Sequence, residues 1–458
     1  MTVGTWWGES HMRARSNSQL HRPGHVARWR GTTARLLVMA TAALGLPLIA
    51  GASSAAAAGP CDAPVVNKVA CENTKPGTPE SEWRVDGVDD EIVGFTTDIS
   101  TNVGGTVRFK VSSPATSWKI DIYRLGWYGG DGARLMGSIG NFGRSNVTAN
   151  NQATNCMVTN ATIGLVDCGN WAVSGSWTVP TTAVSGLYYA VLHRNDTGGE
   201  NEVPFVVRDD SSHSDVMFQT SDETWQAYNR YGGNSLYSGT GPGDGGSAYA
   251  VSYNRPIAGG GDENYIFNAE VPALRFLEAN GYDLTYSTDV DADRNGALIK
   301  NHKVYMPVGH DEYWSAGQRN NVEAARAAGV SMAFLTGNEI FWKTRFDVST
   351  DGTNTPYRTV YCYKETKANA KIDPSPQWTG SWRDPRFSPP GDGGRPENSL
   401  TGVMFMSNSD DLTMQVPAAQ GKLRQWRNTS VANLAAGQTA SLAPHTIGYE
   451  SDEDVDNG

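Results

Sequence analysis

The sequence predicts a multidomain exported protein, in which an N-terminal β-sandwich precedes an α/β domain with a mostly parallel sheet of the flavodoxin-like or amidotransferase-like kind. Three observations predict this architecture. The first 58 residues have the pattern of an export signal, residues 85–208 form short alternating runs, and residues 215–458 alternate between strand and helix patterns. The length of 458 residues is ample for two or more domains with buried cores.

Residues 1–58 are expected to be a cleaved signal peptide. Arginines precede the apolar run 36–50, and the small residues that follow offer A-x-A sites, which place cleavage near Ala58. The alternative is a permanent membrane anchor, but Pro47 shortens the apolar run below the roughly 20 residues that a spanning helix needs. We therefore expect a secreted protein with no stable membrane span, whose mature part begins with a disulfide-bearing segment over residues 59–84.

The charge of the chain argues against nucleic acid as a partner. The formal net charge is −11, and the first 58 residues carry six Arg against one Glu, so the mature part is near −16. Such an acidic surface repels phosphate backbones. The counts of 51 Gly and 14 Trp indicate many turns and many aromatic contacts in a β-rich exported protein.

The five cysteines predict two local disulfides and one free thiol. Cys61 lies close to Cys71 in the sequence, and Cys156 lies close to Cys168. An oxidising compartment favours disulfides between such neighbours, whereas no C-x-x-C spacing supports a metal site. Cys362 is left over, and we interpret it as a buried free thiol rather than a nucleophile.

The sandwich is predicted from short strands that are separated by turn residues. These strands cover residues 106–111, 118–125, 186–194 and 203–208. Strands that recur with turn signals and without a helical period favour two packed antiparallel sheets.

Aromatic side chains in two loops suggest an alternative function. Trp127 and Tyr128 lie beside glycines in one loop, and Trp378 and Trp382 lie in another. Such rings could hold a glycan, although for the loop of Trp127 and Tyr128 packing on a neighbouring domain is the favoured interpretation. The alternative to an enzyme is therefore a non-catalytic glycan-binding protein of the cell surface.

Beyond a polar linker at 209–214, the pattern changes to alternating strands and helices. The expected strands are 215–220, 282–287, 302–309 and 330–337, and the expected helices are 268–279 and 315–328. This alternation indicates a mostly parallel sheet with helices on its faces. Residues 345–400 contain many turn signals and are expected to be irregular.

Polar residues follow three of the four expected strands. These residues are Asp222, Glu223, Thr224 and Tyr228 after the first strand, His310, Asp311, Glu312 and Tyr313 after the third, and Asn338 and Glu339 after the fourth. Ligands of open α/β sheets bind outside the carboxyl ends of the strands, so we expect these side chains to converge on a site.

Simpler explanations exist for several of these residues. Asp222, Thr224 and Asp311 are expected to cap the helices that follow them. Glu312 differs because it directly follows a strongly apolar strand, where a carboxylate must be paired, metal-bound or active in proton transfer. The sequence contains no H-E-x-x-H, G-x-S-x-G or P-loop motif, so zinc-protease, serine-hydrolase and nucleotide-binding functions lose their usual support.

Several long runs resemble one known family. They are TSDETWQAYNRYGGNSLY, VSYNRP, YDLTYSTDVD, VGHDEYWSAGQRNNVEAARAAGVSMAFLTGNEIFWKTRF and PENSLTGVMF. These runs resemble the large (beta) subunit of N,N-dimethylformamidase over residues 215–458, and more loosely over the sandwich. The resemblance implies hydrolysis of a formamide to formate and an amine at one iron ion, which is held by two tyrosines and a glutamate.

The resemblance also implies roles for individual residues. Glu312 matches the glutamate ligand, and His310 matches the histidine beside the metal. Lys364, in the run YCYKE, corresponds to a lysine near the metal.

The two tyrosine ligands are assigned in the same way. Tyr228, in the run TWQAYN, matches one of them. Tyr253 is chosen as the second, with Tyr231 and Tyr237 as rivals. Phenolate and carboxylate oxygens are hard ligands that suit ferric iron, and a metal with open positions can activate water and polarise an amide carbonyl.

We therefore expect an exported metal-dependent hydrolase that acts on the C–N bond of a small amide, and a homo-oligomer is possible. Two departures from the family pattern stand out. The small subunit is not in this chain, and the export signal points to a different setting. The final run, YESDEDVDNG, is expected to contain no strand or helix, so it is either a solvated tail or the point at which the chain is incomplete. The resemblance favours an incomplete chain.

Overall fold

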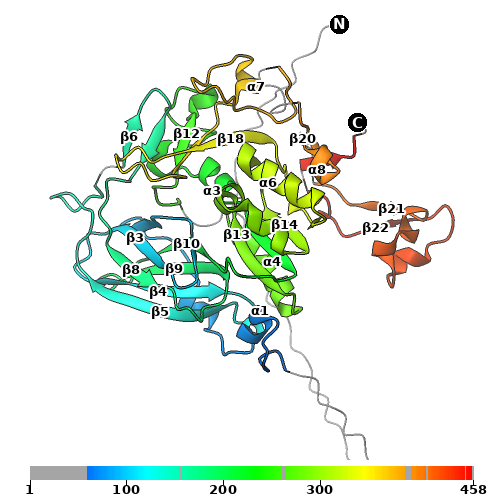
Figure 1. Cartoon of the computed structure of the whole chain (residues 1–458), viewed down its shortest axis with the longest axis horizontal. Coiled ribbons are helices and arrows are strands. Elements are labelled where there is room, and N and C mark those ends of the chain that lie inside the picture. The colour runs from blue at the N-terminus through cyan, green and yellow to red at the C-terminus, as the bar shows by residue number, and fades with distance from the viewer. Residues whose placement is uncertain are drawn as a thin grey trace, which may run out of the picture. The chain divides into compact units, whose positions relative to one another are not determined.

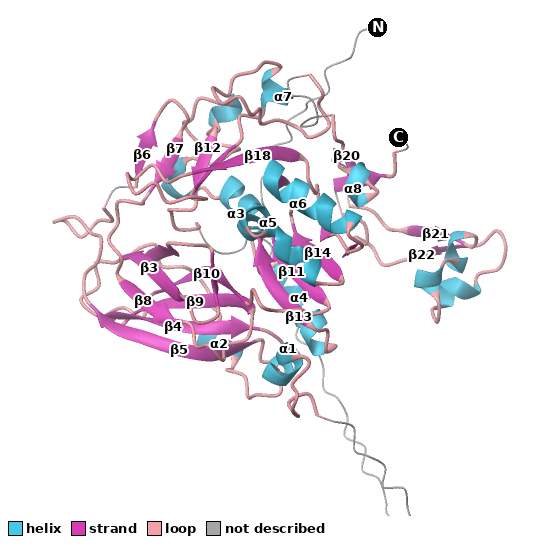
Figure 2. Ribbon diagram, in the orientation of Figure 1, coloured by secondary structure: helices cyan, strands magenta, loops and turns pink. Residues whose placement is uncertain are grey.

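The computed structural model describes residues 59–154, 156–258, 265–386, 394–408, 411–448 and 450–455 (Figures 1 and 2). The expected signal peptide lies outside these residues. Within them, no helix combines the length and the apolar character that a membrane crossing requires. The described chain begins with two short helices, α1 (Lys68–Glu72) and α2 (Glu80–Trp83).

The predicted sandwich is present as two sheets. The first has the order β1-β3-β8, and the second has the order β2-β10-β9-β4-β5. Their strands are β1 (Val93–Thr96), β2 (Ser100–Asn102), β3 (Thr106–Ser112), β4 (Trp118–Leu125), β5 (Ala133–Phe142), β8 (Gly175–Thr178), β9 (Gly186–Arg194) and β10 (Glu200–Arg208). The pairings are antiparallel except that β2 runs parallel to β10. A small pair, β6 (Met157–Asn160) and β7 (Leu165–Asp167), lies between β5 and β8 in the sequence.

Strand β3 shows how the sandwich core forms. Val107, Phe109 and Val111 are buried in the core, whereas Arg108 is exposed and Lys110 is half-buried. Since successive side chains of a strand point to opposite faces, this alternation places the apolar residues between the sheets and the two cations outside the core.

The α/β part is built on a parallel sheet with the strand order β13-β11-β14-β16, to which β17 adds beside β14. The strands are β11 (Val216–Thr220), β13 (Leu284–Thr288), β14 (Val304–Gly309), β16 (Ser331–Met332) and β17 (Leu335–Thr336). In chain order the arrangement is 2-1-3-4, which is the order of flavodoxin-like sheets. This confirms the predicted fold class, although the expected fourth strand is split into two short pieces.

Helices lie between these strands in the sequence (Figure 1). They are α3 (Asp222–Tyr228), α4 (Glu270–Ala279), α5 (Asp289–Arg294) and α6 (Ala316–Ala327). The two faces of the sheet belong to different cores. Phe218 of β11 shares a core with Leu274 of α4 and with sandwich residues, whereas Met217 shares a core with Val322 of α6. The sheet is therefore covered on both faces.

A second, mostly antiparallel sheet has the order β12-β19-β18-β15. Its strands are β12 (Ala250–Ser252), β15 (Tyr313–Ser315), β18 (Trp342–Asp347) and β19 (Thr359–Tyr361), and a short helix, α7 (Glu365–Ala368), follows. The expectation that residues 345–400 are irregular is therefore wrong for part of this segment. The pairing of β18 with β19 supplies the order that the turn-rich sequence does not indicate.

The C-terminal part also contains strands. They are β20 (Met404–Asn408), β21 (Gln415–Pro417), β22 (Thr439–Ser441) and β23 (Glu450–Glu453), with the helix α8 (Asn398–Thr401) before them. Strand β23 lies in the acidic run for which no strand was expected, and it pairs with β20. That expectation is wrong because backbone pairing, rather than burial of apolar side chains, orders this segment.

A buried ion pair joins the sandwich to the α/β part. Arg124 of β4 and Glu278 of α4 are both fully buried, and Arg124 Nη2 lies 2.7 Å from Glu278 Oε1. Tyr286 also donates to Glu278, over 2.6 Å. Because a buried charge is costly unless it is paired, this contact fixes how β4 packs on α4.

The cysteines pair as predicted. Disulfides join Cys61 to Cys71 and Cys156 to Cys168, and Cys362 is buried and free. Burial raises the pKa of the Cys362 thiol to about 12, so the thiol is not poised as a nucleophile. The two disulfides are consistent with an oxidising compartment, and secretion itself remains a prediction.

Candidate functional site

Glu312 lies just beyond the carboxyl end of β14, in the short connection to β15. The connection begins at Gly309, whose φ of +109° and close neighbours Glu270 and Ser221 leave no room for a side chain. The backbone N–H of Glu312 donates to Thr224 Oγ1 over 3.2 Å, and the backbone N–H of Trp342 donates to the carbonyl of Glu312 over 2.9 Å. The main chain of Glu312 is therefore held from two sides.

Two tyrosine hydroxyls donate to the Glu312 carboxylate. The hydroxyl of Tyr228, the last residue of α3, donates to Oε2 over 2.9 Å. The hydroxyl of Tyr237 lies 2.7 Å from each of the two carboxylate oxygens. Their rings stack at 4.2 Å and are only partly buried. Burial, and then the charge of Glu312, raise the pKa of both phenols well above the ordinary value. We call Tyr228, Tyr237 and Glu312 the Tyr–Tyr–Glu cluster.

A histidine and a lysine lie beside the cluster. His310 Nε2 is 3.6 Å from Glu312 Oε2, and the His310 ring is 5.5 Å from the ring of Tyr228. Lys364 Nζ lies 3.4 Å from the centre of the Tyr237 ring, which is a close cation–π contact. Burial lowers the pKa of Lys364 to about 8, although the nearby charge of Glu312 acts in the opposite direction. Lys364 has a φ of +49°, a left-handed conformation that is uncommon outside glycine.

The other two candidate tyrosines do not join this cluster. Tyr253 donates instead to Asp222 Oδ2 over 2.7 Å in the interior. Tyr231 packs instead against a small separate core that contains Phe95 and Trp171. The structure thus brings Tyr228 and the rival residue Tyr237 to Glu312. The sequence contains one local signal for Tyr237, which is the glycine-rich turn between two tyrosines only nine positions apart. This spacing permits both tyrosines to face one point but does not require it.

Buried carboxyl groups lie behind the cluster. They are Asp222, Glu223, Asp289 and Asp311, and all four are fully buried. The side-chain amide of Gln219 donates to Asp289 over 2.7 Å and to Asp311 over 3.0 Å. Burial raises the pKa of each carboxyl, and that of Asp222 reaches about 7.

The expectation that Asp222, Thr224 and Asp311 cap helices is wrong. Asp222 accepts from the backbone N–H of Asp289 over 2.7 Å, and Thr224 accepts from Glu312. Asp311 accepts from Gln219, while Ser315 is the residue that caps α6. Through these hydrogen bonds, the three side chains link the segments that follow different strands, and they do not cap a helix.

Glu339, which follows the expected fourth strand, does not contact the Tyr–Tyr–Glu cluster. It forms a hydrogen bond with Thr336 instead. Burial, and to a smaller extent the negative charge of Asp452, raise the pKa of Glu339 to about 7. The expected convergence therefore holds for the ends of β11 and β14, which are neighbours in the sheet.

The aromatic platform of the alternative function is not formed. Trp378 and Trp382 are fully buried, Tyr128 is 2% exposed, and Trp127 is 36% exposed. Three of the four rings therefore offer no free face to a glycan.

Within the part of the chain that the structure describes, no group of three or more His, Cys, Asp or Glu side chains is arranged to hold a metal ion. The Tyr–Tyr–Glu cluster has a different composition, with two phenols and one carboxylate. The fold and this cluster define an α/β protein with oxygen donors at the carboxyl edge of a parallel sheet, at the point where the strand order reverses.

The comparisons with known proteins identify the family. The profile of the family described as "N,N-dimethylformamidase beta subunit-like, C-terminal" matches residues 119–458, so the chain belongs to this family. The match begins inside the sandwich. Among solved structures, a Faecalibacterium prausnitzii beta-glucuronidase is similar over 53% of this chain and 27% of that chain, with 10% identity and a TM-score of 0.16. A TM-score this low supports no inference about the fold or the function of this chain. No curated protein matches the chain.

Proposed function

We propose that this protein is an exported metal-dependent hydrolase that acts on the C–N bond of a small amide, with one iron ion held by Tyr228, Tyr237 and Glu312. The observation that carries the proposal is the convergence of two phenol hydroxyls on one carboxylate, within 2.7–2.9 Å. Tyr237 takes the place of Tyr253, the second tyrosine that the sequence favours, because the Tyr253 hydroxyl donates to Asp222.

The donor set fits a hard cation such as ferric iron. Both hydroxyls already point at the same carboxylate, so the three groups can share a cation once the two hydroxyl protons are released. Both tyrosines are partly exposed, which places the cluster near the protein surface. When bound, the iron would polarise an amide carbonyl and lower the pKa of a water molecule.

The neighbouring residues support this chemistry. His310 lies close enough to Glu312 Oε2 to orient the carboxylate or to carry a proton at Nε2. Lys364 places its ammonium over the Tyr237 ring, where a positive charge stabilises the ionised phenol. Thr224 and Trp342 hold the backbone on either side of the Glu312 side chain.

A metal and activity assay on the exported protein tests the proposal. We expect about one iron per chain, and release of amine from N,N-dimethylformamide or a related small amide. Glu312→Gln keeps the size of the side chain but removes its charge, so it should lose the iron and the activity. Asp373→Asn is a matched control at a buried carboxylate that pairs with Arg345. A wild-type chain that takes up no iron from ferrous or ferric salts would contradict the metal site.

A further inference from the structure

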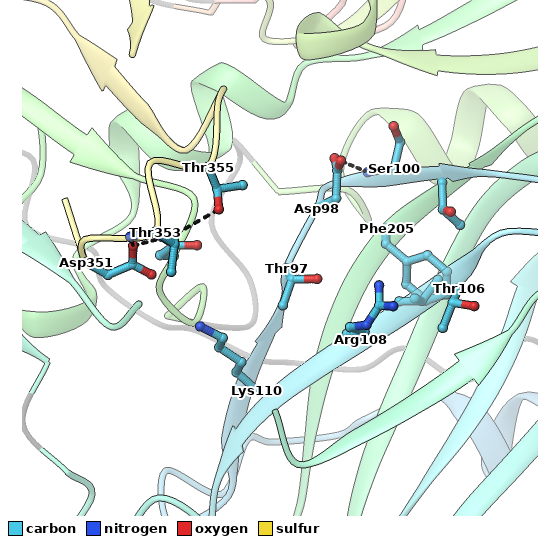
Figure 3. A pocket seen from close by; sticks show the side chains of 13 residues that line it. Thr97, Asp98, Ser100, Thr106, Arg108, Lys110, Phe205, Asp351, Thr353 and Thr355 are labelled. Carbon is cyan, nitrogen blue, oxygen red and sulfur yellow. Dashed lines mark hydrogen bonds between the residues drawn. The ribbon is translucent and has the colours of Figure 1, made fainter. Parts of the chain in front are cut away.

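A cleft lies between the sandwich and the α/β part, away from the Tyr–Tyr–Glu cluster. Its volume is about 370 Å³, within the range of small-molecule sites. The sandwich supplies one wall from β2, β3 and the turn before β2, and the segment 351–355 supplies the other. Figure 3 shows Asp351, Thr353 and Thr355 facing Thr97, in the turn before β2, and Arg108 of β3.

The sandwich wall carries a cation that no carboxylate of the described chain pairs. Arg108 points away from the sandwich core because its neighbours Val107 and Phe109 point into it, and its side chain is exposed. Lys110, two positions further along the same face of β3, donates to the carbonyl of Gly169 over 2.7 Å. A guanidinium in this position is suited to a bidentate contact with a carboxylate.

The two carboxylates of the cleft are already engaged. Asp98 forms an ion pair with Arg294 at 2.9 Å. Asp351 accepts from the hydroxyls of Thr353 and Ser349, over 2.6 and 2.8 Å. The charge of Asp351 also acts on the nearby Lys110 ammonium. Among the described residues, Arg108 is therefore the cation of the cleft lining that forms no ion pair.

Hydroxyl groups make up much of the remaining lining. Those of Thr97, Thr101 and Thr106 find no hydrogen-bond partner within the described residues, so they are available to a ligand. On the opposite wall, the Thr353 and Thr355 hydroxyls lie 2.8 Å apart, which fixes their positions. The single aromatic ring of the lining, Phe205, is fully buried, so the cleft offers no surface on which a nucleobase could stack.

We propose that this cleft binds a sugar that carries a carboxylate, with the carboxylate on Arg108 and the sugar hydroxyls on the threonines of both walls. The volume accommodates one or two sugar rings. The proposal does not rest on the iron site, because no residue of the cleft belongs to the Tyr–Tyr–Glu cluster.

Titration calorimetry on the full chain tests the proposal with four probes. D-Galacturonate and D-glucuronate supply both the carboxylate and the hydroxyls, D-galactose lacks the carboxylate, and glutarate lacks the hydroxyls. We expect at least one uronate to bind about tenfold or more tightly than galactose or glutarate. If galactose binds as tightly as the uronates, the proposed contact between Arg108 and a carboxylate is wrong. If glutarate binds as tightly as the uronates, the ligand is not a sugar.

Two variants locate the binding. Arg108→Gln should weaken uronate binding about tenfold or more, since hydrogen bonds to a charged group are the strongest in such a site. Arg144→Gln is a matched control, because Arg144 is an exposed arginine of the same sandwich that does not line the cleft. Unchanged uronate binding in Arg108→Gln, or no uronate binding by the wild type at millimolar concentration, would overturn the proposal. Both variants should keep the wild-type melting temperature and iron content.

Discussion

Two tyrosine–carboxylate contacts near one edge of the parallel sheet differ in their surroundings. Tyr253 donates to Asp222, and Tyr237 donates to Glu312, over the same distance of 2.7 Å. Asp222 is fully buried, and it also accepts from the backbone of Asp289 and from the hydroxyl of Thr220. Glu312 is approached instead by phenols that are partly exposed.

The difference separates a structural contact from a candidate ligand set. The lone pairs of Asp222 are used by donors that fix neighbouring loops, so this carboxyl holds the end of β11 against the end of β13. Among the described residues, the side chain of Glu312 meets side-chain groups that carry protons, namely the hydroxyls of Tyr228 and Tyr237 and the ring of His310. A tyrosine beside a carboxylate is thus not enough to define a site. Two partly exposed phenols that donate to one carboxylate, with a cation beside them, are consistent with one.

The largest expected effect is on stability, and it tests the structural half of this comparison. Asp222→Ala leaves three donors in the interior without their acceptor, so it should lower the free energy of unfolding by about 3 kcal/mol or more. In metal-free protein, Glu312→Ala should cost only about 1 kcal/mol, because the two donors that lose their acceptor belong to Tyr228 and Tyr237, whose side chains are partly exposed. Urea denaturation of both variants measures the difference. A cost for Glu312→Ala as large as that for Asp222→Ala would contradict the comparison.

A smaller effect concerns pH and the buried carboxyl Glu270, which accepts from the Trp225 indole N–H over 2.9 Å. Burial raises the pKa of Glu270 from 4.5 to about 7. The folded state therefore binds the proton more tightly than the unfolded state, and this contribution is complete below pH 4.5 and is lost as the pH rises through 7. From pH 6 to pH 8, the stability of the wild type should fall by about 1 kcal/mol through this group.

Glu270→Gln provides the check. The amide has no proton to lose, and its oxygen can still accept from Trp225, so this variant should show a flatter loss of stability over the same pH range. Asp283, whose pKa is also raised but which is only partly buried, is a suitable second position for comparison. An unchanged pH slope in Glu270→Gln would show that Glu270 does not titrate in this range.

The fold could largely be predicted because its signals are local. The alternation in β3, the buried strand β11 and the short cysteine spacings each lie within a few residues, and the structure contains the corresponding elements. Strand β23 could not be predicted, because it consists of acidic residues that are ordered by pairing with β20. The ion pair of Arg124 and Glu278 also left no local signal, since the two residues are far apart in the chain.

The candidate site was only partly predictable, for a similar reason. Glu312 was recognisable as a carboxylate directly after an apolar strand, and the family resemblance pointed to Tyr228. The choice between Tyr237 and Tyr253 depended on how the glycine-rich segment after α3 folds back, which is a long-range property. Tyr253 follows β12 and turns into the interior, so its apparent suitability came from residue type alone.

The visible spectrum of the iron-loaded protein tests the central claim most directly. Phenolate bound to ferric iron gives a charge-transfer band, so Tyr237→Phe should weaken this band in protein that is still folded. Tyr253→Phe is the matched control, because it also removes one hydroxyl that donates to a carboxylate. The account predicts a normal band for Tyr253→Phe and a weakened one for Tyr237→Phe. A band that survives in Tyr237→Phe and is lost in Tyr253→Phe would contradict it.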